Sequence, residues 1–340
     1  MAQHATPRPG LRALADLATP MAVRVAATVR VADHLTEGPR TAAELAAAIG
    51  ADQDALDRLL RHLTGLDLMT RYADGRYELT DFGQQLREDH PAGRRKWLDI
   101  DGAVGKGDLS FVDLLHTVRT GEPAYPVRYG LGFWDDLAAD PALSASFDEL
   151  MGHHQELDNG ALARVFDWAA LGHLVDVGGG SGALLAGLLA AHPALRGTLV
   201  DLAGPVAAAR SRFAALGLSG RAEAVEGSFF EPLPAGAGGY VLSAIIHDWA
   251  DEPAVAILRR CAEAAGEKGS VLLIEAVGSD GESPSTAMDL RMLAYCGGRE
   301  RGLDELCAVA ARAGLALRAV HPYGYMSVVE FAAAREPDRR

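Results

Sequence analysis

The sequence is poor in cysteine, in uncharged apolar runs and in net positive charge, and each shortage excludes a class of protein. The three cysteines, Cys261, Cys296 and Cys307, are too few and too scattered for a disulfide framework or a metal site. No uncharged apolar run is long enough to span a bilayer. Charged residues also interrupt the alanine-rich N-terminus, where a secretory signal would need an apolar core. We therefore expect a cytoplasmic protein with no metal and no membrane partner.

The charge balance argues against nucleic acid as a partner. Aspartate and glutamate number 46 against 32 lysines and arginines, which gives a formal net charge of −14. Such a molecule repels nucleic acid and anionic membrane surfaces. With 49% hydrophobic and 23% charged residues, the composition is that of an ordinary folded protein. Its length is sufficient for two domains.

The first hundred residues predict short helices followed by a hairpin. Thr41 and Glu44 fit a capping box at the start of a helix that ends at Gly50. Residues 54–69 place leucines at helical spacing, which indicates an amphipathic helix with one buried stripe. An Asp-Gly pair within residues 71–80 (RYADGRYELT) is a strong hairpin signal. Together these elements predict a winged-helix unit.

A winged-helix unit often binds DNA, so that alternative has to be weighed. The helix that would read DNA starts near Asp52 and carries Asp54 and Asp57 in its first turns, against Arg58 and Arg61. A DNA-reading helix needs basic groups that contact phosphate. We therefore favour a structural or dimerisation role for this unit.

The second half of the sequence has a different pattern. Residues 101–165 are expected to be mostly helical, with a Pro/Gly-punctuated loop at 121–132. Strand candidates then alternate with helical stretches, which predicts an α/β fold with a doubly wound parallel sheet and ligands at the carboxyl ends of its strands. The candidates are residues 174–177, 198–202, 239–246 and 270–275. We expect three parts, at residues 1–100, 101–165 and 166–340.

A glycine-rich turn follows the first of these strands. Residues 176–182 (DVGGGSG) precede a helical stretch, and Gly178 and Gly180 would let the backbone turn sharply and approach a ligand. Asp201 ends the next strand about twenty residues on, where an acid can bind ribose hydroxyls. The pair predicts an adenosine-containing cofactor and leaves a dinucleotide and S-adenosylmethionine both open. A turn that serves packing alone is the alternative reading.

Two features favour S-adenosylmethionine. The α/β part begins after a large helical part, and its turn contains the crowded run 178–180. A third strand-end element, residues 226–230 (EGSFF), lies where an adenine pocket would form. Phe229 offers a stacking face for the base there, although Phe229 and Phe230 could equally belong to the core.

A histidine provides a candidate general base. Residues 243–249 (SAIIHDW) lead a strand out of the sheet, so His247 is expected at its carboxyl end, facing the ligand crevice. An imidazole has a pKa of about 6.5 and a phenol one of about 10, so the imidazole can assist removal of the phenol proton at neutral pH. A merely structural histidine is the alternative.

Two acids are candidates to orient this imidazole. Glu275 ends the strand candidate at 270–275, and Glu300 lies in residues 297–301 (GGRER). A carboxylate bound to the far ring nitrogen would fix the tautomer and stabilise the imidazolium. For Glu300, a solvated loop charge paired with Arg299 or Arg301 is an equal alternative.

These motifs together resemble the plant caffeate-type and bacterial antibiotic-tailoring O-methyltransferases over nearly the whole chain. The resemblance rests on residues 176–182, on His247 with the Asp and Trp that follow it, and on residues 297–301. It implies a Rossmann-like S-adenosylmethionine-binding domain preceded by a winged-helix dimerisation domain, in a homodimer. Gly178, Gly180 and Asp201 would then bind the cofactor. His247 would be the base, flanked by Glu275 and Glu300.

The resemblance assigns further residues. Residues 147–151 (FDELM) are similar to a Phe/Met segment of the family, which would put Met151 against the acceptor, in a pocket that Trp134 and Asp248 also line. Ser228 stands where the family usually has an aspartate, and Ser243 where plant members often have a lysine. We assign both serines, with Phe229, to the cofactor.

Residues 108–111 (DLSF) and 119–121 (RTG) look like the anthracycline-tailoring branch of this family. Some members of that branch bind S-adenosylmethionine yet hydroxylate or decarboxylate their substrates. His247 favours methylation of a hydroxyl on an aromatic, polyketide-type acceptor. The alternatives are a non-methylating tailoring enzyme and, third, a winged-helix regulator that senses S-adenosylmethionine.

Overall fold

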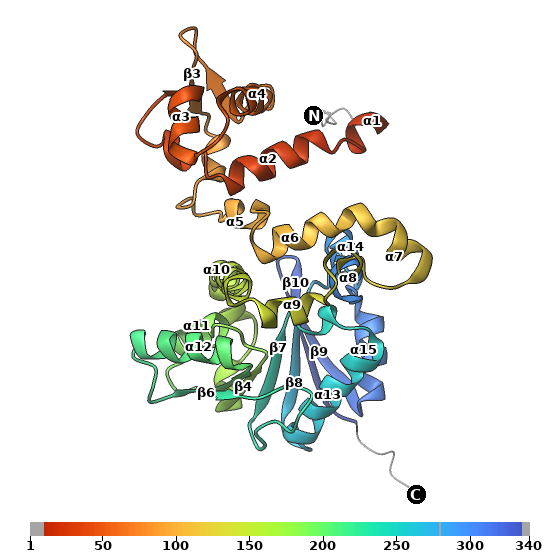
Figure 1. The fold of residues 1–340 in the computed structure, drawn as a ribbon. Coiled ribbons are helices and arrows are strands. Elements are labelled where there is room, and N and C mark those ends of the chain that lie inside the picture. The colour runs from red at the N-terminus through yellow and green to blue at the C-terminus, as the bar shows by residue number, and fades with distance from the viewer. Residues whose placement is uncertain (1–9, 279, 335–340) are drawn as a thin grey trace, which may run out of the picture. The chain divides into compact units, whose positions relative to one another are not determined.

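The computed structural model describes residues 10–278 and 280–334, apart from the side chains of residues 153–159. The chain divides into two compact units, Met1–Lys106 and Gly107–Arg340. Figure 1 shows the helices and the small hairpin of the first unit and the large sheet of the second. The first unit has one hydrophobic core, and the second has two, which lie on the two faces of its sheet.

The first unit is the predicted winged helix. Its helix α3 (Ala42–Ile49) begins with the capping box of Thr41 and Glu44 and ends at Gly50, whose φ is +69°. The other elements are α1 (Leu11–Leu14), α2 (Ala18–Thr28), α4 (Gln53–Thr64), α5 (Arg94–Leu98), β1 (Arg40–Thr41), β2 (Met69–Arg71) and β3 (Arg76–Leu79). Strands β2 and β3 form the hairpin, and β1 pairs with β3 on its other side.

Helix α4 is shorter than the sequence pattern predicts. It ends at Thr64, whereas the leucine spacing predicted a helix to residue 69. The backbone turns at Asp67, which has a φ of +59°, and Met69 already belongs to β2. Leu60, Leu63 and Met69 are nonetheless all buried in the core of this unit.

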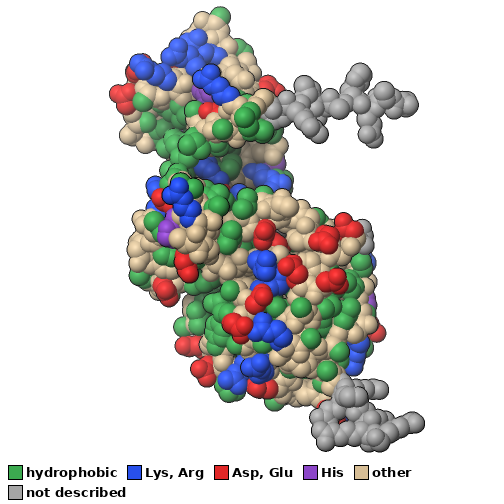
Figure 2. Space-filling model, turned by 90° about the vertical axis from the view of Figure 1, so that its right-hand side faces the viewer, with side chains coloured by type: hydrophobic (Ala, Val, Ile, Leu, Met, Phe, Trp, Pro, Cys, Tyr) green, Lys and Arg blue, Asp and Glu red, His purple; other side chains and the backbone are tan. Residues whose placement is uncertain are grey.

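Three arginines of α4 and the hairpin form ion pairs with neighbouring acids. Figure 2 shows basic side chains gathered on the first unit with acidic ones beside them. The pairs are Arg58 with Asp54 at 2.7 Å, Arg61 with Asp57 at 3.1 Å and Arg76 with Asp74 at 2.7 Å. Each of these arginines is already bound to a carboxylate, so it is less available to contact a DNA phosphate.

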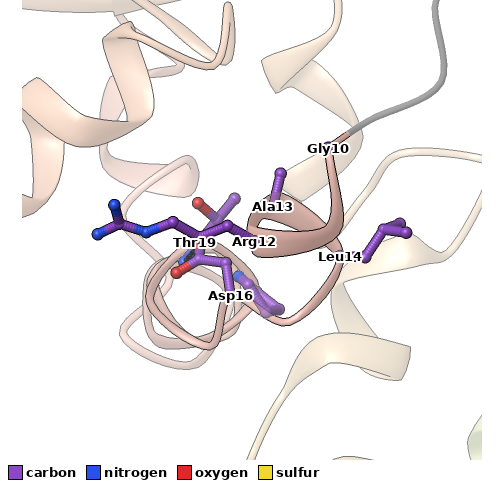
Figure 3. A pocket seen from close by; sticks show the side chains of 7 residues that line it. Gly10, Arg12, Ala13, Leu14, Asp16 and Thr19 are labelled. Atoms are coloured by element: carbon purple, nitrogen blue, oxygen red, sulfur yellow. Dashed lines mark hydrogen bonds between the residues drawn. The ribbon is translucent and has the colours of Figure 1, made fainter.

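A hollow of about 810 Å³ lies at α1 and the beginning of α2 in the first unit. Figure 3 shows Arg12 and Leu14 directed to opposite sides of α1, with Asp16 and Thr19 at the start of the next helix. The Asp16 carboxylate accepts the backbone N–H groups of Ala18 and Thr19. The hollow contains neither the glycine turn nor His247, so its size does not mark the candidate site.

The second unit contains a seven-stranded sheet in the order β6-β5-β4-β7-β8-β10-β9. The first five strands in that order are parallel, and β10 runs antiparallel to both of its neighbours. The strands are β4 (His173–Val177), β5 (Arg196–Asp201), β6 (Ala222–Glu226), β7 (Gly239–Ser243), β8 (Ser270–Glu275), β9 (Leu315–Tyr323) and β10 (Met326–Ala333).

Helices cover both faces of this sheet, as the predicted doubly wound fold requires. Figure 1 shows α11 (Ala183–Ala191) and α12 (Ala203–Ala215) on one side, and α13 (Asp251–Ala265) and α15 (Leu303–Arg312) on the other. Alternate strand residues enter the two cores: Leu174 and Val241 face the first helix pair, and Val175 and Leu242 face the second.

The strand order reverses at β4, which has β5 on one side and β7 on the other. Connections leave in opposite directions at such a point, and the crevice beyond the strand ends is where ligands bind in doubly wound sheets. The sequence predicted the strands on both sides of this point. It did not predict the C-terminal hairpin of β9 and β10, which lies at the far edge of the sheet.

Helical residues before the sheet complete the second unit. The described elements are α6 (Ala103–Leu109), which crosses the division between the units, α7 (Leu114–Thr120), α8 (Tyr125–Tyr129), α9 (Phe133–Ala139) and α10 (Pro141–Val165), with α14 (Thr286–Cys296) later in the chain. Asp140 caps α10 by accepting the N–H groups of Ala142 and Leu143. Among the residues that the structure describes, none of the helices has the length and apolar content needed to cross a membrane.

Candidate active site

The glycine turn between β4 and α11 has the backbone that the sequence predicted. Gly178, Gly180 and Gly182 have φ values of +72°, +55° and +76°, in the left-handed region that favours glycine. A Cβ at Gly178 would lie 2.7 Å from Ile245 Cδ1. The N–H of Gly180 donates to Asp201 Oδ2 at 2.8 Å. The structure therefore brings Gly178, Gly180 and Asp201 together at the strand reversal.

Asp176 is an acid of this turn whose importance the sequence analysis missed. Its side chain is 1% exposed, and its Oδ2 has no hydrogen-bond partner within the described residues. Burial and the charge of Asp201 raise the pKa of this carboxyl to about 7. A Cβ at Gly179 would come within 2.6 Å of that Oδ2, so the oxygen lies directly against the turn. A buried polar atom without a partner needs an explanation, such as a bound ligand or water, and a polar cofactor at the ends of the strands would provide one.

Phe229 lies beside the glycine turn. A Cβ at Gly178 would meet its Cδ1 at 3.5 Å, and its ring packs edge-on against Trp249 with centroids 5.8 Å apart. Ser228 accepts the N–H of Phe230 at 3.2 Å within its own turn. Ser243 ends β7 and is half-buried. Because Asp176 pairs with Val241, continuing this register places Ser243 level with Gly178.

His247 lies on a single 3-10 turn, Ile246–Asp248, rather than at the end of a strand. The predicted strand 239–246 is too long, because β7 ends at Ser243 and the next residue, Ala244, has a φ of +52°. A left-handed residue cannot continue a strand. The turn still follows the carboxyl end of β7, at the strand reversal.

Three carboxylates surround the imidazole. His247 Nδ1 lies 2.8 Å from Glu300 Oε1 and 3.9 Å from Glu275 Oε2, and Nε2 lies 3.4 Å from Asp248 Oδ1. The side chain of Glu300 is 3% exposed, so it is not a solvated loop charge. Arg299 and Arg301 pair instead with Glu305 and Asp251. Glu275 also accepts the N–H of Ile246 at 3.0 Å, which ties the turn to the end of β8.

This arrangement favours the charged imidazole. Burial opposes the charge, but the negative charges of Asp248, Glu275 and Glu300, with the hydrogen bond from Glu300, outweigh it and raise the pKa of His247 to about 10. Burial in turn raises the pKa of Asp248 to about 6 and that of Glu275 to about 7. In the protein alone, the imidazole therefore holds its proton at neutral pH.

Two residues of the 297–301 segment hold the histidine turn. The guanidinium of Arg301 donates to the carbonyl oxygens of Ile246 and Trp249, at 2.9 Å each. Gly298 packs so closely that a Cβ there would lie 2.2 Å from the carbonyl oxygen of His247. The segment that carries Glu300 therefore also fixes the backbone of its partner.

Aromatic rings extend from the histidine turn to α9 and α10. Trp134 stacks on Trp249, with centroids 6.4 Å apart and planes at 17°, and meets Phe147 edge-on at 5.6 Å. Its Nε1 is buried and has no partner among the described residues. Met151 lies one helical turn after Phe147 and is half-buried. No group of His, Cys, Asp and Glu side chains in the described part of the chain is arranged to hold a metal ion.

Comparison with known proteins identifies both parts of the chain. Residues 11–89 match an O-methyltransferase dimerisation domain, and residues 111–316 match an O-methyltransferase domain. The chain is 67% identical to 2,7-dihydroxy-5-methyl-1-naphthoate 7-O-methyltransferase of Streptomyces carzinostaticus, with 95% of this chain and 97% of that protein covered. It is 45% identical to aclacinomycin 10-hydroxylase RdmB of Streptomyces purpurascens, with 96% and 90% covered.

A solved structure extends this similarity to the fold. The O-methyltransferase NcsB1 from neocarzinostatin biosynthesis, in complex with S-adenosylmethionine and 2-hydroxy-5-methyl naphthoic acid, matches with a TM-score of 0.92 at 66% identity. The match covers 97% of this chain and 100% of that one.

The charge state of His247 is directly measurable. We expect the ring to titrate well above pH 7 in nuclear magnetic resonance spectra of the protein alone, with the resonance identified by its loss in His247→Gln. Glu300→Gln removes the nearest negative charge and should lower the midpoint by about 1–3 units. Glu305→Gln, a more exposed change in the next helix, should leave it in place. A native midpoint at or below about 6.5 would show that the carboxylates do not stabilise the imidazolium.

Proposed function

This chain belongs to the S-adenosylmethionine-dependent O-methyltransferase family, and on that premise we propose that it methylates a hydroxyl of a bicyclic aromatic acid of the hydroxynaphthoate class, with His247 as the general base. The observation that carries the proposal is the imidazole bonded to Glu300 at the strand reversal, beside the glycine turn. The acceptor class follows from the 67% identity to a dihydroxy-methyl-naphthoate O-methyltransferase.

Residues of the strand ends would hold the cofactor. We assign the ribose hydroxyls to Asp201, the close backbone approach to Gly178 and Gly180, and the adenine to Phe229, with Ser228 and Ser243 at its edge. Bound S-adenosylmethionine supplies an electrophilic methyl group on a cationic sulfur. The orphan oxygen of Asp176 supports this assignment, because a buried carboxylate is stabilised by a nearby positive charge.

His247 would accept the proton of the acceptor hydroxyl at Nε2. Glu300 at Nδ1 fixes the tautomer that leaves Nε2 as acceptor, and Glu275 stabilises the imidazolium that forms. The raised pKa of about 10 makes the imidazole a strong base. The same raised pKa means that the ring carries a proton at neutral pH, and it must release this proton before it can accept the one from the acceptor hydroxyl. A cationic cofactor nearby assists that loss, because like charges disfavour the protonated ring.

We propose that residues 101–165 line the acceptor site through Trp134 and Met151. The unpartnered Nε1 of Trp134 supports a hydrogen bond to an oxygen of the acceptor, and its stacking on Trp249 supports a flat aromatic pocket. Asp248 lies on the Nε2 side of His247, where the acceptor hydroxyl would approach. The role of Trp134 rests on its contact with Trp249, that of Met151 on its place one helical turn after Phe147, and that of Asp248 on its distance from Nε2.

Methyl transfer competes with one other chemistry. The 45% identity to an aclacinomycin hydroxylase favours a non-methylating use of the same cofactor as the second candidate. The imidazole with its bound carboxylate favours methyl transfer, because it provides a base for a phenol. Product mass separates the two, since methylation adds a CH₂ unit to the acceptor and hydroxylation adds an oxygen.

We also propose a homodimer that acts in the cytoplasm. The dimerisation-domain match at residues 11–89 includes α1, where Leu11, Leu14 and the following Leu17 are 83%, 68% and 68% exposed. A second copy that covers these leucines would remove them from water. All three cysteines are free thiols, which suits a reducing compartment.

Loss of the base should abolish turnover without abolishing cofactor binding. With labelled S-adenosylmethionine and a panel of hydroxynaphthoic acids, His247→Gln should lower kcat by about 10²–10⁴-fold and leave the cofactor Kd near its native value. The control His321→Gln, on strand β9, should keep native turnover. A His247 variant that retains full rate would remove the imidazole from the mechanism.

The close packing at Gly298 offers a separate test of positioning. Gly298→Ala forces a methyl group against the His247 carbonyl, so the turn must shift, and a misplacement of about 1 Å should lower kcat by about 10²-fold. Gly204→Ala is the matched control on α12, where a Cβ would meet nothing within 4 Å. Equal turnover in both variants would show that the turn tolerates displacement.

The proposed dimer has a simple measurement. Sedimentation should give twice the 35.8 kDa of one chain. Replacing Leu11 and Leu14 together by aspartate should shift the population towards monomer, whereas Leu216→Asp, at a leucine 58% exposed at the end of α12, should not. A native protein that sediments as a monomer at micromolar concentration would contradict the proposal.

A further inference from the structure

The middle of helix α10 lies against the glycine turn. A Cβ at Gly152 would come within 2.8 Å of Ser181 Oγ, so this side of the helix contacts the turn directly. Asp148 precedes Gly152 by four residues, and residues four apart share one face of a helix. Asp148 is therefore on the face of α10 that covers the turn.

The carboxylate of Asp148 is near enough to Asp201 for the two negative charges to interact. It is half-buried, and burial together with the charge of Asp201 raises its pKa to about 6. Arg212 lies at the same turn, where its Nε donates to the Ser181 carbonyl oxygen at 3.1 Å. Neither Arg212 nor any other cation or hydrogen-bond donor in the described part of the chain shifts the pKa of Asp148. Asp148 and Asp201 thus repel each other in the protein alone.

Two buried polar atoms next to these acids also lack partners. Asp176 Oδ2 and Ser181 Oγ have no hydrogen-bond partner among the described residues, and Asp176 is 1% exposed. Three carboxylates, Asp148, Asp176 and Asp201, therefore surround one glycine turn. Carboxylates held this close are stabilised by a cation with several N–H donors.

We propose that Asp148 binds the α-ammonium group of the cofactor's amino-acid tail. The inference rests on the use of S-adenosylmethionine proposed above and adds a residue to its site. A sulfonium has no N–H groups, whereas an ammonium has three donors that can reach a carboxylate and a neighbouring hydroxyl such as Ser181. Asp201 is already assigned to the ribose hydroxyls, which are neutral. The ammonium group would therefore lie on the side of the turn that Asp148 covers.

In this role, Asp148 would distinguish ligands that carry the α-ammonium group from ligands that lack it. S-adenosylmethionine and S-adenosylhomocysteine both carry the ammonium, and only the first carries the sulfonium. 5′-Methylthioadenosine carries neither and retains the adenosine. Loss of an ammonium contact should therefore weaken the first two ligands equally and leave the third unchanged.

The test is calorimetric titration of these three ligands into Asp148→Asn and native protein. A charged hydrogen bond contributes roughly 10-fold to 100-fold in affinity, so the Kd values of S-adenosylmethionine and S-adenosylhomocysteine should both rise by about that factor. The Kd of 5′-methylthioadenosine should not change. Glu149→Gln, an exposed acid next in the helix, is the matched control and should bind all three ligands as native protein does.

The Tm of each Asp148 variant checks that the substitution has not disturbed the fold. Asparagine has the size of aspartate and removes the repulsion with Asp201, so the Tm of Asp148→Asn should equal or exceed the native value. Asp148→Ser is the second variant, with the same expected pattern of Kd values.

Each other outcome overturns the inference. An equal loss for all three ligands would assign Asp148 to packing, a loss for S-adenosylmethionine alone would assign it to the sulfonium, and no loss would remove it from the site. Failure of native protein to bind either tailed ligand would instead overturn the proposed cofactor use itself.

Discussion

The hydrogen bond between His247 and Glu300 is the interaction on which the site depends. It joins a 3-10 turn at the end of β7 to the segment after α14, two parts of the chain 53 residues apart. Neighbouring hydrogen bonds support this one. Glu275 accepts from the N–H of Ile246, and Arg301 donates to the carbonyl oxygens of Ile246 and Trp249, on either side of the histidine. A buried carboxylate and a buried imidazolium stabilise each other here, where either alone would be unfavourable.

Negative charge is concentrated at two places near the carboxyl ends of the central strands. Asp248, Glu275 and Glu300 surround the imidazole, and Asp148, Asp176 and Asp201 surround the glycine turn. Burial raises the pKa of most of these carboxyls, which shows that the protein alone does not fully compensate their charge. A cationic cofactor bound as proposed would compensate it from outside the chain. The acidity of the site would therefore match the positive charge of the proposed cofactor.

Much of this could be predicted from the sequence, and the reason is local. Thr41, Glu44 and Gly50 fix a helix by contacts within a few residues, and the run 176–182 fixes its turn by backbone geometry, so both were found where expected. The burial of Glu300 could not be predicted, because it depends on Asp289, Ser283 and His247 from elsewhere in the chain. Asp148 was missed for the same reason, since only the packing of α10 on the turn brings it near Asp201. Asp176 was missed because the run 176–182 gives no sign that its Oδ2 lacks a partner. The strand predicted at residues 239–246 is too long, because an apolar run does not reveal that Ala244 adopts a left-handed backbone conformation.

That alanine has a consequence for how firmly His247 is held. Ala244 occupies a left-handed backbone conformation at the exit of β7 that costs a non-glycine residue about 1–2 kcal/mol. Glycine would relieve the strain, but it would also open a wide range of other backbone conformations to the segment that precedes the histidine. A methyl group at this hinge narrows that range. The strain lowers the folding stability somewhat. In return, the segment between β7 and His247 has fewer conformations to choose from, so the ring is already oriented before any ligand arrives.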